Sequence, residues 1–212
     1  MRRVPAFSSL PSWVLLCLIG GTAPAVAQNN APATSRSTKI ANALGAAPAE
    51  IARSAAVKDW PAGEGGEFTV LREGTNRWTC LPDDPTTRGN DPMCLDAVWM
   101  DALTAYFAGR APQVTRVGYA YMLNSDAEGS NTDPMASAPT TENQWHHQGP
   151  HVMVLYPDPT LLEGLPTTPT EYGPYVMFAG TPIAHVMFPT RSGYAARQAG
   201  HGSAAAPASR AP

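Results

Sequence analysis

The clearest periodic pattern of apolar residues lies between Asp91 and Phe107. There, large side chains recur at three- and four-residue spacing, which is typical of a helix with one apolar face. The members of this stripe are Leu95, Val98, Trp99, Ala102 and Tyr106. Asp91 can accept a backbone N–H bond as the N-cap, and Pro92 suits the first helical position. Gly109 and Pro112 are typical helix-ending residues. The pattern therefore predicts one main helix here.

Alternating apolar and polar positions predict strands on both sides of that helix. Glu67–Arg72 alternates, residues 73–76 are turn formers, and Arg77–Leu81 returns, so we expect a hairpin. After the helix, Val114–Leu123 alternates again and predicts a further strand. Val152–Tyr156 has no strongly polar position, which is typical of a central strand covered on both faces.

A second hairpin is predicted near the end of the folded part. Tyr175–Phe178 and Ile183–Phe188 flank Gly180-Thr181, which suits a type II′ turn because the first central residue needs a positive φ. That turn would place Val176 opposite His185. Together these elements predict an α+β fold, a mostly antiparallel sheet of five or six strands with one main amphipathic helix packed on it, plus short N-terminal helices.

The first residues predict export. A short basic region is followed by the apolar run Trp13–Gly21, and then by Ala25-Val26-Ala27, where signal peptidase requires small residues. The apolar run is too short to span a bilayer, and no later apolar segment reaches the ~20 residues needed. We therefore expect a soluble secreted or periplasmic protein. Its expected parts are a signal peptide (1–27), a flexible linker (28–37), a short helical segment (38–59), a single α+β domain (60–194) and a disordered tail (195–212).

Charge narrows the class of partner. The whole chain holds 14 basic and 17 acidic residues, but residues 60–195 hold 6 basic and 15 acidic ones. A domain this acidic, without a cluster of Lys or Arg, is a poor match for nucleic acid or for an anionic membrane surface after signal cleavage. A small ligand or another protein is the expected partner.

Cysteine usage agrees with an oxidising compartment. Cleavage of the signal peptide would leave Cys80 and Cys94, which allow one intramolecular disulfide. Closing a loop of about 15 residues would stabilise the fold by roughly 3 kcal/mol. A metal-binding or redox thiol pair is the alternative, and the wide spacing without a CxxC motif disfavours it.

Two copies of the tripeptide His-Val-Met are candidates for metal binding. In a strand, residues i and i+2 share a face, so His151 would lie beside Met153 and His185 beside Met187. If the two strands are neighbours, this set suits copper, because thioethers are soft ligands, and His147 could add a nitrogen for copper or zinc. The alternative is structural, with Met filling a core and each imidazole bonded to a carbonyl.

A polar loop offers oxygen ligands for calcium. Asp126, Glu128, Asn131 and Asp133 are hard ligands of the type that Ca²⁺ prefers. Their spacing does not match an EF-hand loop. The same residue types also favour ordinary turns, because their side chains bond their own backbone. Calcium is therefore a weaker prediction than copper or zinc.

The sequence does not decide whether the protein is an enzyme. It contains no G-x-S-x-G motif and no glycine-rich phosphate loop followed by lysine. Aromatic residues in predicted strands and helices are expected to fill the core. Trp145 differs because it lies in a polar loop beside His146, so these two residues are the candidate binding patch.

Whole phrases of the chain are similar to a family of exported bacterial proteins with no assigned function. The phrases are residues 46–60, Leu71–Cys80, Asn90–Asp96, Ser130–Pro134 and Ala184–Met187. They cover roughly residues 46–189 and are specific in combination. The resemblance implies one domain with a secretory signal, and it implies no activity, substrate or cofactor.

The sequence thus favours an exported ligand- or partner-binding module, stabilised by a Cys80–Cys94 disulfide. The alternative is a copper- or zinc-binding protein, or a metal-dependent hydrolase, that uses His151 and His185.

Overall fold

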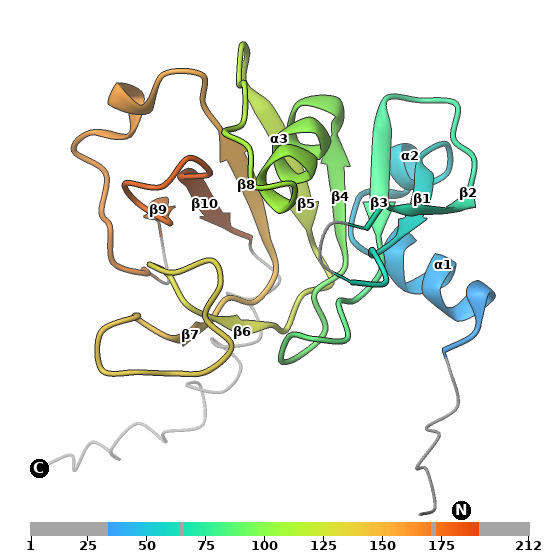
Figure 1. Ribbon diagram of the computed structural model, residues 1–212, viewed down its shortest axis with the longest axis horizontal. Coiled ribbons are helices and arrows are strands. Elements are labelled where there is room, and N and C mark those ends of the chain that lie inside the picture. Colours follow the sequence, from blue (N-terminus) through green and yellow to red (C-terminus); the bar gives the residue numbers. More distant parts are fainter. Residues whose placement is uncertain (1–33, 64–65, 171–172, 191–212) are drawn as a thin grey trace, which may run out of the picture. The chain divides into compact units, whose positions relative to one another are not determined.

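The structure is a computed structural model that describes residues 34–63, 66–170 and 173–190 (Figure 1). Within these residues eight strands form one sheet, in the order β2-β1-β3-β4-β5-β8-β10-β9. They are β1 (Ala56–Asp59), β2 (Thr69–Arg72), β3 (Trp78–Leu81), β4 (Met93–Asp96), β5 (Gly118–Met122), β8 (His151–Leu155), β9 (Tyr175–Met177) and β10 (His185–Pro189). A small second sheet pairs β6 (Glu128–Gly129) with β7 (His146–His147). The helices are α1 (Arg36–Leu44), α2 (Ala49–Ala52), α3 (Ala97–Phe107) and the short 3₁₀ helix η1 (Pro159–Leu162).

The predicted α+β class is confirmed, with a larger sheet than expected. Neighbouring strands of the eight-stranded sheet run antiparallel except for β1 and β3, which are parallel. The predicted signal peptide and the C-terminal tail lie outside the described residues. In the part of the chain that the structure describes, no helix has the length and apolar character needed to cross a membrane.

Helix α3 begins later than predicted. Its N-cap is Asp96, whose carboxylate accepts the backbone N–H of Trp99 at 2.9 Å, so the prediction of Asp91 as N-cap was wrong. Residues 93–96 form strand β4 instead, because their backbone groups pair with β3 and β5 on either side. The predicted C-terminal end is confirmed, since α3 stops at Phe107 and Gly109 has a φ of 66°.

The predicted first hairpin was also wrong. Strand β1 lies between β2 and β3, pairing antiparallel with one and parallel with the other, so β2 and β3 are not neighbours. The sequence of β1 has no clear alternation, which is why its residues fall within the predicted helical segment 38–59. Gly74 lets the connection between β2 and β3 pass close to the start of β1, because a Cβ atom at that position would overlap the backbone of Ala56.

Strands β9 and β10 form the predicted antiparallel pair in a different register. Val176 lies opposite Val186, and His185 lies opposite Met177. The connection is longer than a two-residue turn, with positive φ values at both Phe178 (57°) and Gly180 (79°). The extra residues shift the pairing by one position from the predicted register. Because side chains alternate between the faces of a strand, each side chain then shares a face with a different set of residues on the neighbouring strand.

The sheet separates two cores. One face, called the α3 face below, carries the main core and is covered by α3, which crosses in front of the sheet in Figure 1. The register of the strands determines which side chains share this face. Four of them lie in one row across β5, β8, β10 and β9, namely Ala120, Met153, Met187 and Tyr175. On the opposite face, α1 and α2 cover β1, β3 and β4 with small alanine side chains.

The predicted disulfide is present beneath those two helices. Cys80 and Cys94 lie directly opposite each other in the antiparallel pair β3–β4, with Cα atoms 3.9 Å apart. Both side chains are fully buried, and the Sγ atom of Cys94 is 3.7 Å from the carbonyl oxygen of Ala43 in α1. The bond thus joins two central strands and forms part of the surface on which α1 packs.

Candidate functional site

A cavity of about 340 Å³ lies over the α3 face of the sheet. Its floor is the sheet, one wall is α3, and the other walls are loops that include the segments 84–91, 127–137 and 178–183. A concave, largely apolar space with a few polar groups is the usual form of a small-molecule site. This cavity is therefore the candidate functional site.

Methionine side chains form the floor. Met93, Met122, Met153 and Met177 come from β4, β5, β8 and β9, and each lines the cavity. Side chains alternate between the faces of a strand, so one register suffices to place Met122 and Met153 on the α3 face. Met side chains are flexible and polarisable, which lets such a floor adapt to ligands of different shape.

The close approach of α3 to the sheet depends on Gly118. A Cβ atom at this position of β5 would lie 2.9 Å from Cγ1 of Val98 and 3.3 Å from Cδ1 of Trp99. The absent side chain therefore lets the first turn of α3 pack directly on the strand. This contact sets the position of the Trp99 ring at the cavity wall.

Aromatic rings form much of the remaining wall. Trp60 donates its Nε1–H to the carbonyl oxygen of Pro82 at 2.7 Å and packs edge-on against Phe107, with ring centroids 6.1 Å apart. Trp145 also lines the cavity, and its Nε1 lies 3.5 Å from a carboxylate oxygen of Glu128. The sequence singled out Trp145 as a binding residue, and the structure places it at this cavity.

His185 and Trp99 form a buried part of the lining. Their rings meet edge-to-face, with centroids 5.0 Å apart and an interplanar angle of 78°. The Nδ1 atom of His185 lies 2.8 Å from the carbonyl oxygen of Ile183. Burial lowers the pKa of His185 to about 4, so the ring is neutral at pH 7. The Nε2 atom of His185 and the Nε1 atom of Trp99 are buried and have no hydrogen-bond partner within residues 34–63, 66–170 and 173–190.

A second group of buried polar side chains lies beside the cavity. His146 in β7 places Nε2 3.0 Å from the hydroxyl of Tyr175, whose pKa is raised to about 12 by burial. The Nδ1 atom of His151 lies 2.6 Å from the carbonyl oxygen of Gly149, and burial lowers the pKa of His151 to about 4. Of the predicted patch, Trp145 thus faces the cavity, whereas His146 holds the β6–β7 sheet against β9.

The predicted copper and zinc ligands do not converge on one ion. Strands β8 and β10 are neighbours, as the prediction required, but His151 pairs with Pro189, four residues beyond His185. Four extended residues span about 13 Å, so the two Cα atoms are roughly 14 Å apart once the strand spacing is included. Each Nδ1 is also bonded to a carbonyl just before its own strand, and these carbonyls lie at opposite ends of the antiparallel pair.

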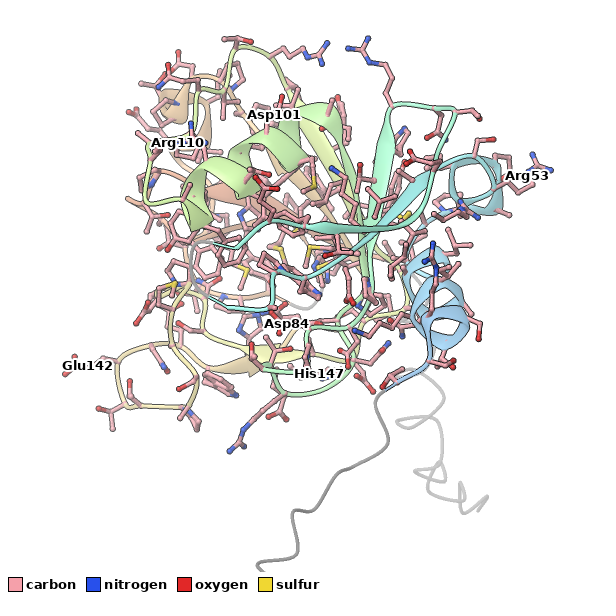
Figure 2. All side chains as sticks on the ribbon, turned by 45° about the vertical axis from the view of Figure 1, so that its right-hand side comes forward. Arg53, Asp84, Asp101, Arg110, Glu142 and His147 are labelled. Carbon is pink, nitrogen blue, oxygen red and sulfur yellow. A yellow bond between two sulfur atoms is a disulfide. The ribbon has the colours of Figure 1, made fainter. Side chains whose placement is uncertain are left out.

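The remaining predicted copper and zinc ligands are Met153, Met187 and His147. Met153 and Met187 lie directly opposite each other, but His147 is exposed in β7 opposite Glu128 (Figure 2). Among the described residues no group of three or more His, Cys, Asp or Glu side chains is placed to hold a metal ion. The sequence's alternative, core Met with carbonyl-bonded His, matches the observed contacts of both imidazoles.

The predicted calcium ligands have other roles. Asp126 accepts the backbone N–H of Asn90, and Asp133 accepts that of Met135. Asn131 is 1% exposed and donates to the carbonyl oxygen of Thr167 at 2.9 Å, so it ties the loop to a neighbouring segment. Glu128 pairs within the β6–β7 sheet. Asp133 therefore bonds within its own loop, whereas Asp126 and Asn131 connect the loop to other segments.

The sequence did not identify Asp91 as a residue of the cavity lining. It is buried, and its carboxylate accepts the backbone N–H of Asp84 at 2.8 Å and the hydroxyl of Thr87 at 2.7 Å. Burial, with a smaller contribution from the neighbouring Asp83, raises the pKa of Asp91 to about 7, although the hydrogen bonds from Asp84 and Thr87 lower it. Figure 2 shows Asp84 on the side of the molecule where the β6–β7 sheet lies. Both oxygens of Asp91 hold this loop closed.

Comparison of the chain with protein-family models, curated proteins and solved structures gave no significant match. The site must therefore be interpreted from its own geometry.

Proposed function

We propose that this protein is an exported binding domain that takes one small, largely apolar molecule into the cavity over the α3 face. The observation that carries this proposal is the lining itself, a space of about 340 Å³ bounded by five Met side chains and several aromatic rings. Apolar surface of this kind binds ligands mainly by removing their apolar area from water. Export remains part of the proposal and is supported by the buried disulfide.

The polar residues at the cavity favour a ligand without negative charge. Asp84, Asp91, Glu128 and Asp133 line it, with Arg88 as the cationic side chain among them. Four carboxyl groups against one guanidinium repel an anionic ligand such as a fatty acid. An uncharged or cationic molecule is the better match to the lining.

Binding rather than catalysis is supported by how the polar groups are engaged. The carboxylate oxygens of Asp91 accept hydrogen bonds from its own loop, and the Nδ1 atom of His185 is held by the backbone of Ile183. A general acid or base must lie within hydrogen-bond reach of the substrate atom that receives or gives up the proton. The arrangement instead resembles a fixed frame around an apolar space.

The test uses N-phenyl-1-naphthylamine, an uncharged dye whose fluorescence rises in apolar surroundings. We expect saturable binding with one site per chain. Leu103 lines the cavity from α3, so Leu103→Trp fills the space and lowers the affinity at least tenfold. Leu161→Trp introduces the same side chain at an exposed position of η1 and should leave the affinity unchanged. Dye binding that is unaffected by Leu103→Trp would place the site elsewhere.

A second candidate function, Cu(I) binding, is favoured by the four thioethers of the cavity floor together with His185. Thioether sulfur is a soft donor that prefers Cu(I). This set differs from the predicted one, because it uses Met93, Met122 and Met177 in place of His147, His151 and Met187. Elemental analysis after loading with Cu(I) under reducing conditions tests it. Stoichiometric copper that is lost in Met93→Leu/Met122→Leu would support it, and less than half an equivalent in the unmutated protein would reject it.

A further inference from the structure

Two unsatisfied ring nitrogens belong to neighbouring side chains in the lining of the cavity. Trp99 is 4% exposed and His185 is 2% exposed, and both residues line the cavity. Among the described residues, the Nε1 atom of Trp99 and the Nε2 atom of His185 have no hydrogen-bond partner. Buried polar groups are satisfied in the great majority of cases, since leaving one unpaired is costly. Two adjacent exceptions at a cavity wall therefore require an explanation.

The hydrogen-bonding role of each nitrogen follows from its chemistry. The Nδ1 atom of His185 faces the carbonyl oxygen of Ile183 at 2.8 Å, and a carbonyl can only accept, so Nδ1 carries the proton. In the neutral ring Nε2 is then an acceptor. The indole Nε1–H of Trp99 can only donate. The centroids of the two rings are 5.0 Å apart at an interplanar angle of 78°, so the donor and the acceptor are carried by neighbouring rings.

We propose that this pair recognises an uncharged hydroxyl group on an otherwise apolar ligand. The hydroxyl would donate its proton to Nε2 of His185 and accept the Nε1–H of Trp99. A hydroxyl performs both roles with a single atom, as the short distance between the rings requires. A carboxylate has no proton to donate, an ammonium group cannot accept, and an ether or ketone can only accept. This inference rests on the proposed function and specifies its ligand class.

The experiment compares three probes that share one ring system. They are 2-naphthol, 2-methoxynaphthalene and naphthalene, and their affinities for the purified exported chain are measured by isothermal titration calorimetry. We expect 2-naphthol to bind at least tenfold more tightly than the other two. The methoxy compound can accept but cannot donate, so it isolates the contribution of His185.

Two variants assign the preference to this pair. His185→Asn retains a side-chain N–H that can reach the carbonyl of Ile183 but lacks the acceptor at Nε2, and Trp99→Phe retains an aromatic ring without the N–H. In either variant the preference for 2-naphthol should fall below threefold while naphthalene affinity changes little. The exposed His147→Asn is the matched control and should keep the full preference.

The outcomes separate this inference from the proposed function. Equal binding of all three probes would overturn the hydroxyl assignment and leave the apolar cavity site standing. A preference that persists in both variants would also overturn it, because the hydroxyl would then be recognised by other residues. Failure of all three probes and of the naphthylamine dye to bind would refute the proposed function itself.

Discussion

Acidification should destabilise this protein through its two buried imidazoles, His151 and His185. Both rings are at most 2% exposed, and burial lowers the pKa of each from 6.5 to about 4. In the unfolded chain the same side chains titrate near 6.5. The folded state thus binds these protons less readily than the unfolded state. The contribution of the neutral imidazoles to the free energy of unfolding is complete above about pH 6.5. It is lost progressively as the pH falls from 6.5 through 4.

The size of the effect follows from the shift. A difference of about 2.5 pKa units corresponds to roughly 3 kcal/mol for each histidine, most of which is lost by pH 4.5. Asp91 acts in the opposite direction. Its pKa is raised from 3.8 to about 7 in the folded state, so its contribution grows as the pH falls from 7 to 4 and offsets part of the loss.

Urea unfolding at pH 7.5, 6.0, 5.0 and 4.5 measures this dependence. His185→Asn and His151→Asn keep a side-chain donor for the carbonyl that each Nδ1 contacts, and both remove the titrating group. Each variant should lose roughly 2–3 kcal/mol less than the unmutated protein between pH 7.5 and 4.5, whatever its stability at pH 7.5. The exposed His147→Asn should show the unmutated pH dependence. Parallel curves for all four proteins would refute the reasoning.

Three further perturbations test other parts of the fold. Replacing Cys80 and Cys94 by Ala should lower the unfolding free energy by about 3 kcal/mol, measured by urea titration, since a loop of about 15 residues is opened. Gly118→Ala should cost about 1–3 kcal/mol and lower the melting temperature in calorimetry, because its Cβ would lie 2.9 Å from Val98; an unchanged melting temperature would contradict the close packing of α3 on β5. Asp91→Asn should raise stability relative to the unmutated protein at pH 8 and less so at pH 5, because the folded state disfavours the charged carboxylate.

Local patterns were sufficient for features that depend on a few neighbouring residues. The repeat His-Val-Met places His185 and Met187 on one face wherever the strand lies, and the structure agrees. The end of α3 was predicted correctly because Gly109 adopts a positive φ, a local conformation that ends helices. The disulfide needed no more than a count of cysteines and a compartment.

Features that depend on distant segments were missed. The stagger between His151 and His185 is set by how the 29 residues between β8 and β10 are accommodated, and no local pattern encodes it. Strand β1 forms because β2 and β3 offer it backbone partners on both sides. The methionine floor requires the order of strands, since Met93, Met122 and Met177 belong to separate segments of the chain.

The position of the disulfide beneath α1 has a consequence for biogenesis. Cys94 touches the backbone of Ala43, and neither sulfur is accessible once α1 has docked. A thiol oxidase can therefore reach the pair before that docking and not afterwards. Enzymatic formation of the bond requires that α1 docks after the two thiols have been oxidised, and a chain in which α1 docks first would retain two reduced, inaccessible thiols.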